Sequence, residues 1–131
     1  MDGKQQQQPA AILVACLVLF TSINSSDAGG GGCSLSTIVV TQSGTGKWAH
    51  GMPVYSATVR NTCRCAQSDV KVDCKGFNTT LSVDPAKLKE IGGGVCLING
   101  GAPLAPGQGV TFSYAWSTQF GFRPVSSTVT C

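Results

Sequence analysis

The stretch that decides the fold is YSATVRNTCRC, residues 55–65. Apolar and polar side chains alternate along it, and Tyr55, Ala57, Val59 and Cys63 share one face of an extended chain. Side chains of a β-strand point to opposite faces in turn, so this period of two predicts a strand with one buried and one wet face. Such strands are typical of antiparallel sheets.

The same alternation recurs outward from this stretch, in residues 69–75, 110–116 and, more weakly, 125–131. Residues 34–42 are rich in Ile, Val and Thr, and the glycine-rich tetrad at 43–46 predicts a turn after them. Several short strands whose apolar faces need a partner are expected to form two facing sheets. The sequence therefore predicts an all-β fold, a small disulfide-stapled antiparallel β-sandwich.

One short helix is expected to interrupt the strands. Asp84 can cap it, Pro85 suits the first helical position, and Gly92 can close its end. Leu88 and Ile91, three residues apart, would then lie on one face of the helix.

Composition excludes several classes of protein. Of the 131 residues, 11% are charged, 42% are hydrophobic and 17 are glycine, which is too apolar for disorder and too glycine-rich for a helical bundle. A net charge of +3 excludes a polybasic nucleic-acid binder. No nucleic-acid partner is expected.

The N-terminal region predicts secretion. Ala10 to Phe20 carries no charge and is too short to cross a bilayer, which needs about 20 residues, but it fits the apolar core of a signal peptide. Ser26-Asp27-Ala28 offers small residues for cleavage. We expect a signal peptide at 1–28, a glycine-rich lead-in at 29–32 and one domain at 33–131. Because no later segment is long and apolar enough, no membrane insertion is expected.

Removal of residues 1–28 also removes Cys16 and leaves an even number of cysteines, which in a small secreted domain predicts three disulfides. These are Cys33, Cys63, Cys65, Cys74, Cys96 and Cys131. Six cysteines allow 15 pairings, among which the sequence does not choose. The spacing Cys63-x-Cys65 is too short for a zinc knuckle, so no metal site is expected.

The search for catalytic residues predicts no catalytic site, no cofactor and no enzyme activity. His50 is the single histidine and has no evident nucleophile beside it. Asp69 and Asp73 share a strand face with Lys71 between them, which is typical of a solvated surface.

Two surface features remain. Asn78-Thr79-Thr80 is an acceptor sequence for N-glycosylation, which predicts a surface loop. Trp48, beside Lys47, either contacts a sugar or protein partner or covers one end of the sandwich core.

The ordered cysteines and their surroundings carry a resemblance that covers roughly residues 33–131. The motifs are Ile38-Val39-Val40-Thr41-Gln42, Gly51-x-Pro53-x-Tyr55, Val59-x-Asn61-x-Cys63-x-Cys65, Val70-x-Val72-x-Cys74-x-Gly76-Phe77, Val83-Asp84-Pro85, Cys96-Leu97-Ile98-Asn99-Gly100, Gly109-Val110-x-Phe112-x-Tyr114-Ala115 and Cys131. In this combination the sequence resembles the tapetum determinant family of secreted plant signalling proteins.

The resemblance implies an extracellular, apoplastic ligand that binds the leucine-rich-repeat ectodomain of a receptor kinase. The signal implied is cell-fate specification in the anther, in tapetal and sporogenous cells. We predict Trp48, Arg60 and Arg64 as receptor contacts, because each combines expected exposure with a side chain that is frequent in binding hot spots.

A second resemblance leads to a different function. The order Ile-x-x-Gln, then Trp, Gly and Tyr, then Val-x-Asn is also similar to β-sandwich cellulose-binding modules of plant glucanases. The alternative hypothesis is therefore a secreted module that binds cell-wall polysaccharide, with Trp48 as its platform residue.

Overall fold

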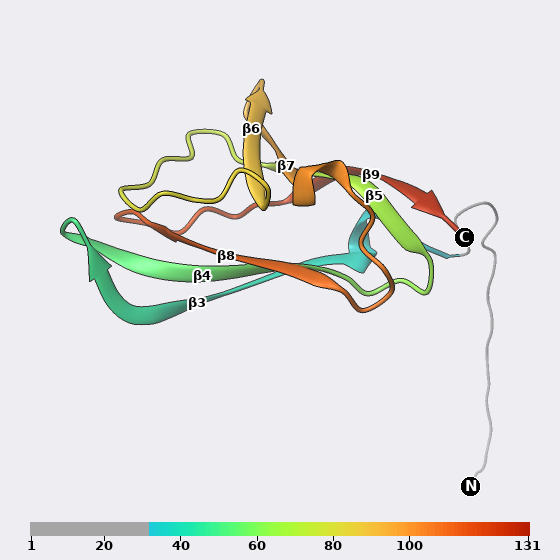
Figure 1. Ribbon diagram of the computed structural model, residues 1–131, viewed down its shortest axis with the longest axis horizontal. Helices are drawn as coiled ribbons and strands as arrows, with labels where there is room; N and C mark the ends of the chain where they lie inside the picture. Colours follow the sequence, from blue (N-terminus) through green and yellow to red (C-terminus); the bar gives the residue numbers. More distant parts are fainter. Residues whose placement is uncertain (1–31) are drawn as a thin grey trace, which may run out of the picture. The chain divides into compact units, whose positions relative to one another are not determined.

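Strands make up most of the regular structure in the computed structural model, which describes residues 32–131 (Figure 1). They are β3 (Ile38–Ala49), β4 (Met52–Asn61), β5 (Ala66–Asp73), β6 (Leu88–Gly92), β7 (Val95–Ile98), β8 (Gly109–Ala115) and β9 (Pro124–Thr130). Two single-turn 3-10 helices, η2 (Leu35–Thr37) and η3 (Asn99–Gly101), accompany them. The expected signal peptide at 1–28, its Cys16 and all of the glycine-rich lead-in except Gly32 lie outside the described residues.

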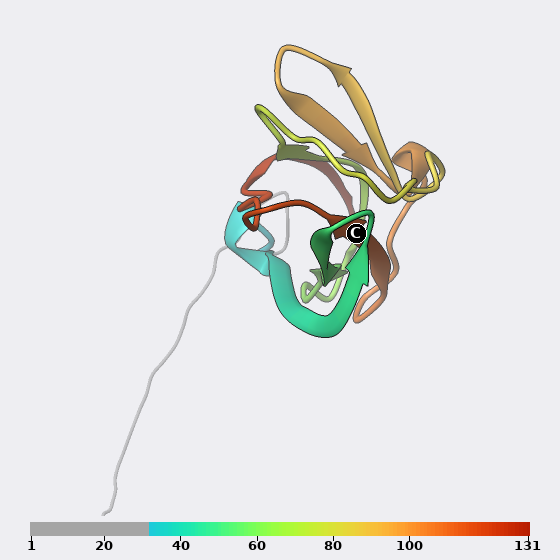
Figure 2. The ribbon, with the colours of Figure 1, turned by 90° about the vertical axis from the view of Figure 1, so that its left-hand side faces the viewer.

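The strands form two antiparallel sheets. One has the order β3-β4-β8 and the other the order β6-β7-β5-β9. In the three-stranded sheet β4 is central, with Val59 opposite both Val40 on β3 and Val110 on β8. In the turned view of Figure 2, β3 curves strongly and the β6–β7 hairpin extends away from it. The predicted all-β, antiparallel two-sheet fold is confirmed.

The core lies between the two sheets and is built from the alternating positions that the sequence predicted. Ala57 and Val59 from β4 meet Val70 and Val72 from β5, and all four are buried. Six aromatic rings fill one part of this core and pack edge-on or tilted against one another, which suits the charge distribution of aromatic rings. They are Tyr55, Phe77, Phe112, Tyr114, Phe120 and Phe122.

The turn predicted at residues 43–46 is wrong, because β3 continues through it to Ala49. Ser43 and Gly44 are paired with β4, and the register shifts between Gly44 and Trp48, so the second half of the tetrad lies in a bulge. The hairpin turns at His50 and Gly51, whose φ angles are 49° and 79°. Two successive positive φ angles are typical of the tight turn that matches the twist of a two-stranded hairpin.

The short helix predicted between Asp84 and Gly92 is also wrong. Asp84 does form a cap-like turn, in which its carboxylate accepts the Ala86 N–H at 2.9 Å and its carbonyl accepts the Lys87 N–H at 2.9 Å. The chain then becomes β6, in which Leu88 is 5% exposed while Ile91 is 46% exposed. Pairing with β7 across a three-glycine turn stabilises the strand and overrides the local helix signals.

Candidate functional site

The predicted contact residues lie at two ends of the β3–β4 hairpin. We call the region of the tight turn, residues 45–51, the hairpin end. Trp48 lies here and is 70% exposed. The Thr45 hydroxyl donates to the Val54 carbonyl at 2.9 Å and accepts the Lys47 N–H at 3.1 Å, which fixes the bulge that presents the indole. The indole is therefore exposed and does not cover one end of the core.

Arg60 and Arg64 lie at the opposite end, which we call the cysteine end: residues 60–65 with the disulfides Cys33–Cys63 and Cys65–Cys131. Both arginines are exposed. The Arg60 Nη1 donates to the Gly107 carbonyl at 2.7 Å, which holds its side chain over the neighbouring turn. Both cations therefore belong to the cysteine end.

Trp48 is not brought to them. It pairs with Pro53, seven residues before Arg60 on β4, which corresponds to about 23 Å along a strand. Moreover, Trp48 and Pro53 fall in the same alternating set as the inward-facing Tyr55, whereas Arg60 belongs to the outward set with Thr58. The tryptophan and the arginines therefore mark different surfaces.

A buried amide network beneath the cysteine end was missed by sequence reasoning. Asn61 is fully buried; its Nδ2 donates to the carbonyls of Cys65 (2.8 Å) and Leu104 (2.9 Å). Its Oδ1 accepts the Cys63 N–H and the Gln67 Nε2, both at 2.9 Å. All four bonding positions of the amide are used, as burial of a polar side chain requires. The available signal was the position of Asn61 in the inward set of β4, where an apolar residue is expected.

Gln67 extends this network to other elements. It is also fully buried, and its Nε2 donates to the Thr37 hydroxyl at 2.9 Å while its Oε1 accepts the Ser127 hydroxyl at 2.6 Å. The two amides thus connect η2, β4, β5 and β9. The backbone that carries Arg60 and Arg64 is held by hydrogen bonds as well as by disulfides.

The cysteine pairing, which the sequence left open, is Cys33–Cys63, Cys65–Cys131 and Cys74–Cys96. The first two disulfides are neighbours, and the sulfur atoms of Cys33, Cys63 and Cys65 lie within 4.8 Å of one another. Each of these sulfurs is already bonded in a disulfide. Since the thiolate is the form that binds metal, the oxidised cluster offers no metal ligands.

The charge of the described residues is positive, with eight Lys and Arg residues in 33–131 against four Asp and Glu residues. Within residues 32–131 one ion pair occurs, between Arg123 and Asp73 at 3.3 Å. Arg60 and Arg64 consequently carry no ion-pair partner in the part of the chain described. They are free to attract an acidic surface, an effect that salt weakens.

The outer face of the three-stranded sheet is lined by hydroxyls. Two rows of paired residues run across β3, β4 and β8, and together we call them the hydroxyl face. One row is Thr41, Thr58 and Thr111, and the other is Ser43, Ser56 and Ser113. The Thr58 and Thr111 hydroxyl oxygens are 2.7 Å apart. A hollow of about 200 Å³ lies over four of the six residues. Sequence reasoning missed this face, because it depends on the register of three strands.

Asn78, the predicted glycosylation site, is exposed in the loop after β5. Its side-chain oxygen accepts the Thr79 N–H at 2.8 Å. The hydroxyl of Thr80, the third residue of the acceptor sequence, donates to the Ala49 carbonyl at 2.8 Å. The acceptor loop is therefore attached to the hairpin end rather than to the cysteine end.

Other titratable groups have structural explanations. His50 is exposed and holds the left-handed position of the hairpin turn. Burial raises the pKa of the Tyr114 phenol above its usual 10.0; the N–H of Phe120, 3.1 Å from the phenol oxygen, opposes this shift, and nearby Tyr55 adds to it. The Tyr114 hydroxyl donates to the Gln42 Oε1 at 2.6 Å. Within residues 32–131 no helix has the length and apolarity needed to cross a membrane.

Comparisons with known proteins place the chain among named plant relatives. The chain is 34% identical over 100 residues to TPD1 protein homolog 1B of Oryza sativa subsp. japonica, which covers 76% of this chain and 58% of that protein. It is 33% identical over 101 residues to TPD1 protein homolog 1 of Arabidopsis thaliana, covering 76% and 55%. The chain thus spans little more than half the length of these relatives.

A third relative, TPD1 protein homolog 1A of Oryza sativa subsp. japonica, is 33% identical over 89 residues, or 62% of this chain and 38% of that protein. No solved structure matches the chain. The family model described as Tapetum determinant 1, C-terminal, matches residues 34–131, which contain both ends of the hairpin and five of the six paired cysteines. The chain therefore belongs to the Tapetum determinant 1 family.

Proposed function

We propose that this chain is a secreted protein ligand that binds the leucine-rich-repeat ectodomain of a receptor kinase and specifies cell fate in the anther. The observation that carries the proposal is the family match over residues 34–131, because membership of this family supports a signalling role in plants. The apolar stretch at Ala10 to Phe20 supports secretion into the apoplast. The ligand acts by binding, without chemistry of its own.

The cysteine end supplies the first contacts in this proposal. Arg60 and Arg64 are exposed and lack carboxylate partners among residues 32–131. Two disulfides and the Asn61 amide hold their backbone in place, so little conformational freedom is lost on binding. Trp48 remains a candidate contact of the hairpin end, and a glycan on Asn78 would lie on the loop bonded to that end.

A binding titration tests the ligand proposal. The secreted chain, with its disulfides intact, is titrated by surface plasmon resonance against purified ectodomains of leucine-rich-repeat receptor kinases. The expected result is saturable binding to at least one ectodomain, weakened by added salt. Failure to bind any member of a representative ectodomain set would reject the ligand proposal.

Polysaccharide binding is a second candidate function, favoured by the hydroxyl face and its hollow of about 200 Å³. Hydroxyls both donate and accept hydrogen bonds, as sugar hydroxyls require. The exposed Trp48 would offer a separate stacking surface, because its pairing with Pro53 places it in the alternating set opposite to the hydroxyl face. However, the aromatic residues that could extend a planar row are in or against the core, among them Tyr55, Phe112 and Tyr114.

A pull-down on cellulose separates the two functions. Retention of the wild-type chain, abolished by Trp48→Ala or by replacing Thr41, Ser56 and Thr58 with alanine, would favour the polysaccharide module. Passage of the wild-type chain through cellulose, together with saturable ectodomain binding, is the result that the ligand proposal predicts.

A further inference from the structure

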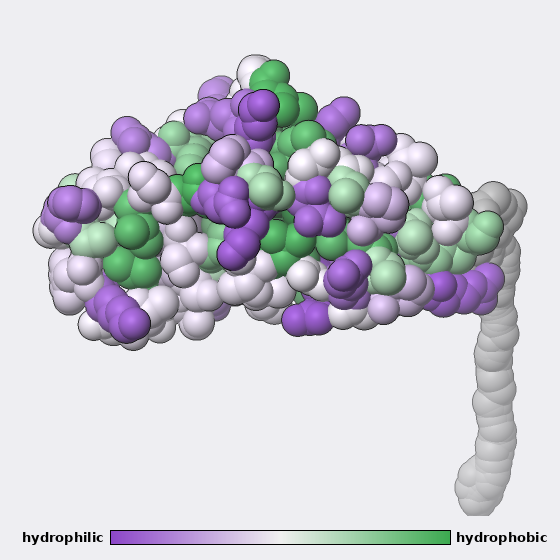
Figure 3. Space-filling model, viewed as in Figure 1, coloured by the Kyte–Doolittle hydropathy of each residue, from purple (hydrophilic) through white to green (hydrophobic). Residues whose placement is uncertain are grey.

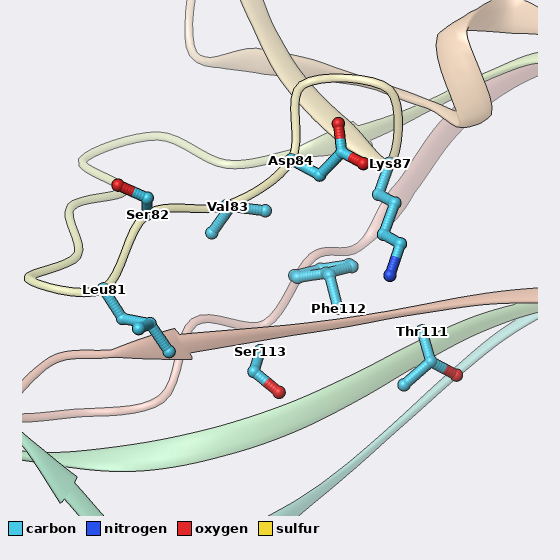
Figure 4. Close-up of a pocket in the computed structure, with 8 residues that line it drawn as sticks. All are labelled: Leu81, Ser82, Val83, Asp84, Lys87, Thr111, Phe112 and Ser113. Carbon is cyan, nitrogen blue, oxygen red and sulfur yellow. The ribbon is translucent and has the colours of Figure 1, made fainter.

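One edge of the three-stranded sheet is open beside a groove. The outer edge of β8 faces residues 81–87, and between them lies a groove of about 470 Å³ (Figure 4). Its walls are Leu81, Ser82, Val83, Asp84 and Lys87 on one side and Thr111, Phe112 and Ser113 on the other. This volume falls within the range of about 300–1,000 Å³ that is usual for ligand pockets.

The hydrogen bonds of β8 show which of its backbone groups face this groove. The carbonyl of Gln108, just before the strand, accepts the Asn61 N–H. The backbone N–H and C=O groups of the even-numbered residues that follow therefore face β4. Ala115 points the other way, because its carbonyl accepts the Thr80 N–H and its own N–H donates to the Thr79 hydroxyl, both at 2.9 Å. Thr111 and Ser113 share the outward orientation of Ala115.

Thr111 and Ser113 therefore present N–H and C=O groups along the groove. Within residues 32–131 neither backbone group of either residue has a protein hydrogen-bond partner. At Ala115 the chain itself occupies the edge through Thr79 and Thr80, and then it diverges from β8. Along Thr111 and Ser113 the groove lies where a neighbouring strand would pair, and no segment of residues 32–131 pairs there.

The β8 edge also lacks the features that usually protect edges from pairing. Natural sheets protect them with charged residues, prolines and bulges. β6 carries Lys89 and Glu90, β9 begins at Pro124, and β3 contains a bulge. β8 reads GVTFSYA and has none of these features. An edge without such protection, beside an open groove, is expected where a sheet binds an added strand.

The groove indicates the character of the strand that would fit. In Figure 4 the Lys87 ammonium group points toward β8, and the Phe112 ring points toward residues 81–87. Lys87 has no carboxylate within ion-pair distance among the described residues, while Asp84 accepts the Ala86 N–H. Leu81 and Val83 are partly buried apolar walls. Hydrophobic patches show in the middle of this face of the molecule (Figure 3).

We propose that the open edge of β8 is a peptide-docking site, at which an extended segment of a partner protein adds as a further strand and places an acidic side chain near Lys87. Main-chain hydrogen bonds to Thr111 and Ser113 supply affinity, and the apolar walls and Lys87 supply selectivity, as in other cases of strand addition. The inference does not rest on the proposed receptor contacts, because these lie at the ends of the β3–β4 hairpin.

The test uses the disulfide-intact chain and a fluorescein-labelled heptapeptide, acetyl-Thr-Val-Thr-Val-Asp-Val-Thr-amide, in a polarisation titration. Two further peptides carry N-methyl groups on the backbone nitrogens of alternate residues: one peptide on its odd-numbered residues, the other on its even-numbered residues. The expected result is saturable binding that one methylation pattern weakens at least about tenfold while the other changes it less than about threefold, because only alternate N–H groups of an added strand face β8. A peptide that does not bind at about 1 mM, or two patterns with equal effect, would overturn the proposal.

Chain variants locate the site. Lys87→Glu is expected to weaken the acidic peptide at least about tenfold and to bind better a peptide with Lys in place of Asp. Ser113→Pro removes an N–H that β4 does not use and should weaken binding, whereas Ser113→Ala keeps it and should not. If the Ser113→Pro variant does not fold, the methylated peptides still test strand addition on the wild-type chain. Sedimentation that shows a dimer disrupted by mutation of β8 would place a second copy at this edge and overturn the peptide proposal.

Discussion

The two ends of the β3–β4 hairpin are held in different ways. At the cysteine end, two disulfides and a buried amide network fix the chain around Arg60 and Arg64. At the hairpin end, the turn at His50 and Gly51 is held by strand pairing and by hydroxyls, such as that of Thr80 on the Ala49 carbonyl. Covalent and buried polar links resist local opening more than exposed hydrogen bonds do. The comparison indicates that the cysteine end is the rigid surface and the hairpin end the adaptable one.

The largest effect is expected from breaking the disulfide that closes the longest loop. Cys65→Ser with Cys131→Ser opens a loop of 66 residues, for which loop entropy gives a loss of about 4.3 kcal/mol in the free energy of unfolding. The matched control, Cys74→Ser with Cys96→Ser, opens 22 residues and should cost about 3.4 kcal/mol. Urea unfolding measures both. A loss below about 1 kcal/mol for the first pair would contradict the account of the cysteine end.

Asn61→Leu tests the network beneath the same end. The change leaves the Cys65 carbonyl and the Cys63 N–H without their Asn61 partner in a buried site. It also removes one of the hydrogen bonds of the Leu104 carbonyl and of the Gln67 amide, which keep their bonds to the Gln67 N–H and to the Thr37 hydroxyl. We expect a loss of about 3 kcal/mol, since each unsatisfied buried group costs about 1–3 kcal/mol and neighbours relax in part. Asn78→Gln, at an exposed asparagine, is the control and should stay within about 0.5 kcal/mol. Equal stability of the two variants in urea would show that the network is dispensable.

Tyr114→Phe probes the aromatic core that both ends share. It removes the bond to Gln42 and the acceptor of the Phe120 N–H, which should cost about 1–2 kcal/mol near neutral pH. Because folding raises the pKa of Tyr114, its stabilising effect is present below the unfolded pKa near 10.0 and is lost as pH rises through the folded pKa. Unfolding at about pH 8 and about pH 11 should show a steeper alkaline loss in the wild type than in the variant. Parallel losses would contradict this role.

The smallest effect on stability is expected for Trp48→Ala at the hairpin end. The side chain is 70% exposed, and surface substitutions of this kind usually stay within about 0.5 kcal/mol. Thermal unfolding checks the value. A loss above about 2 kcal/mol would mean that the indole covers the core, which the structure does not show.

The sequence predicted much of the fold because alternation of side chains is a local property. Ala57, Val59, Val70 and Val72 all lie on the buried faces that their spacing predicted. The errors occurred where pairing with another strand overrides local preference, as for Leu88 to Gly92, which pairs with β7. The sequence also predicted a turn at residues 43–46, although Ser43 and Gly44 pair with β4 and the next two residues lie in a bulge of β3.

The candidate site could be predicted only in part for the same reason. The exposure of Arg60 and Arg64 follows from local chemistry, whereas for Trp48 the sequence left a position over the core open; all three are exposed. Their grouping depends on strand register, which pairs Trp48 of β3 with Pro53, seven residues from Arg60 on β4. The hydroxyl face and the open edge of β8 likewise require the order β3-β4-β8, which no single segment contains. The cysteine pairing joins residues up to 66 positions apart and was equally out of reach.

The most direct test of the central claim, that the chain is a ligand whose rigid cysteine end contacts the receptor, is a charge reversal measured on the ectodomain that binds the wild type. Arg60→Glu with Arg64→Glu should weaken binding at least about tenfold, or 1.4 kcal/mol, with the fold and the disulfides intact. The control, Lys75→Glu with Lys89→Glu, makes the same change of charge on two exposed residues, one in the turn after β5 and one on β6, and should weaken binding less than about threefold. Undiminished binding by the arginine variant, or equal losses for both pairs, would contradict the claim.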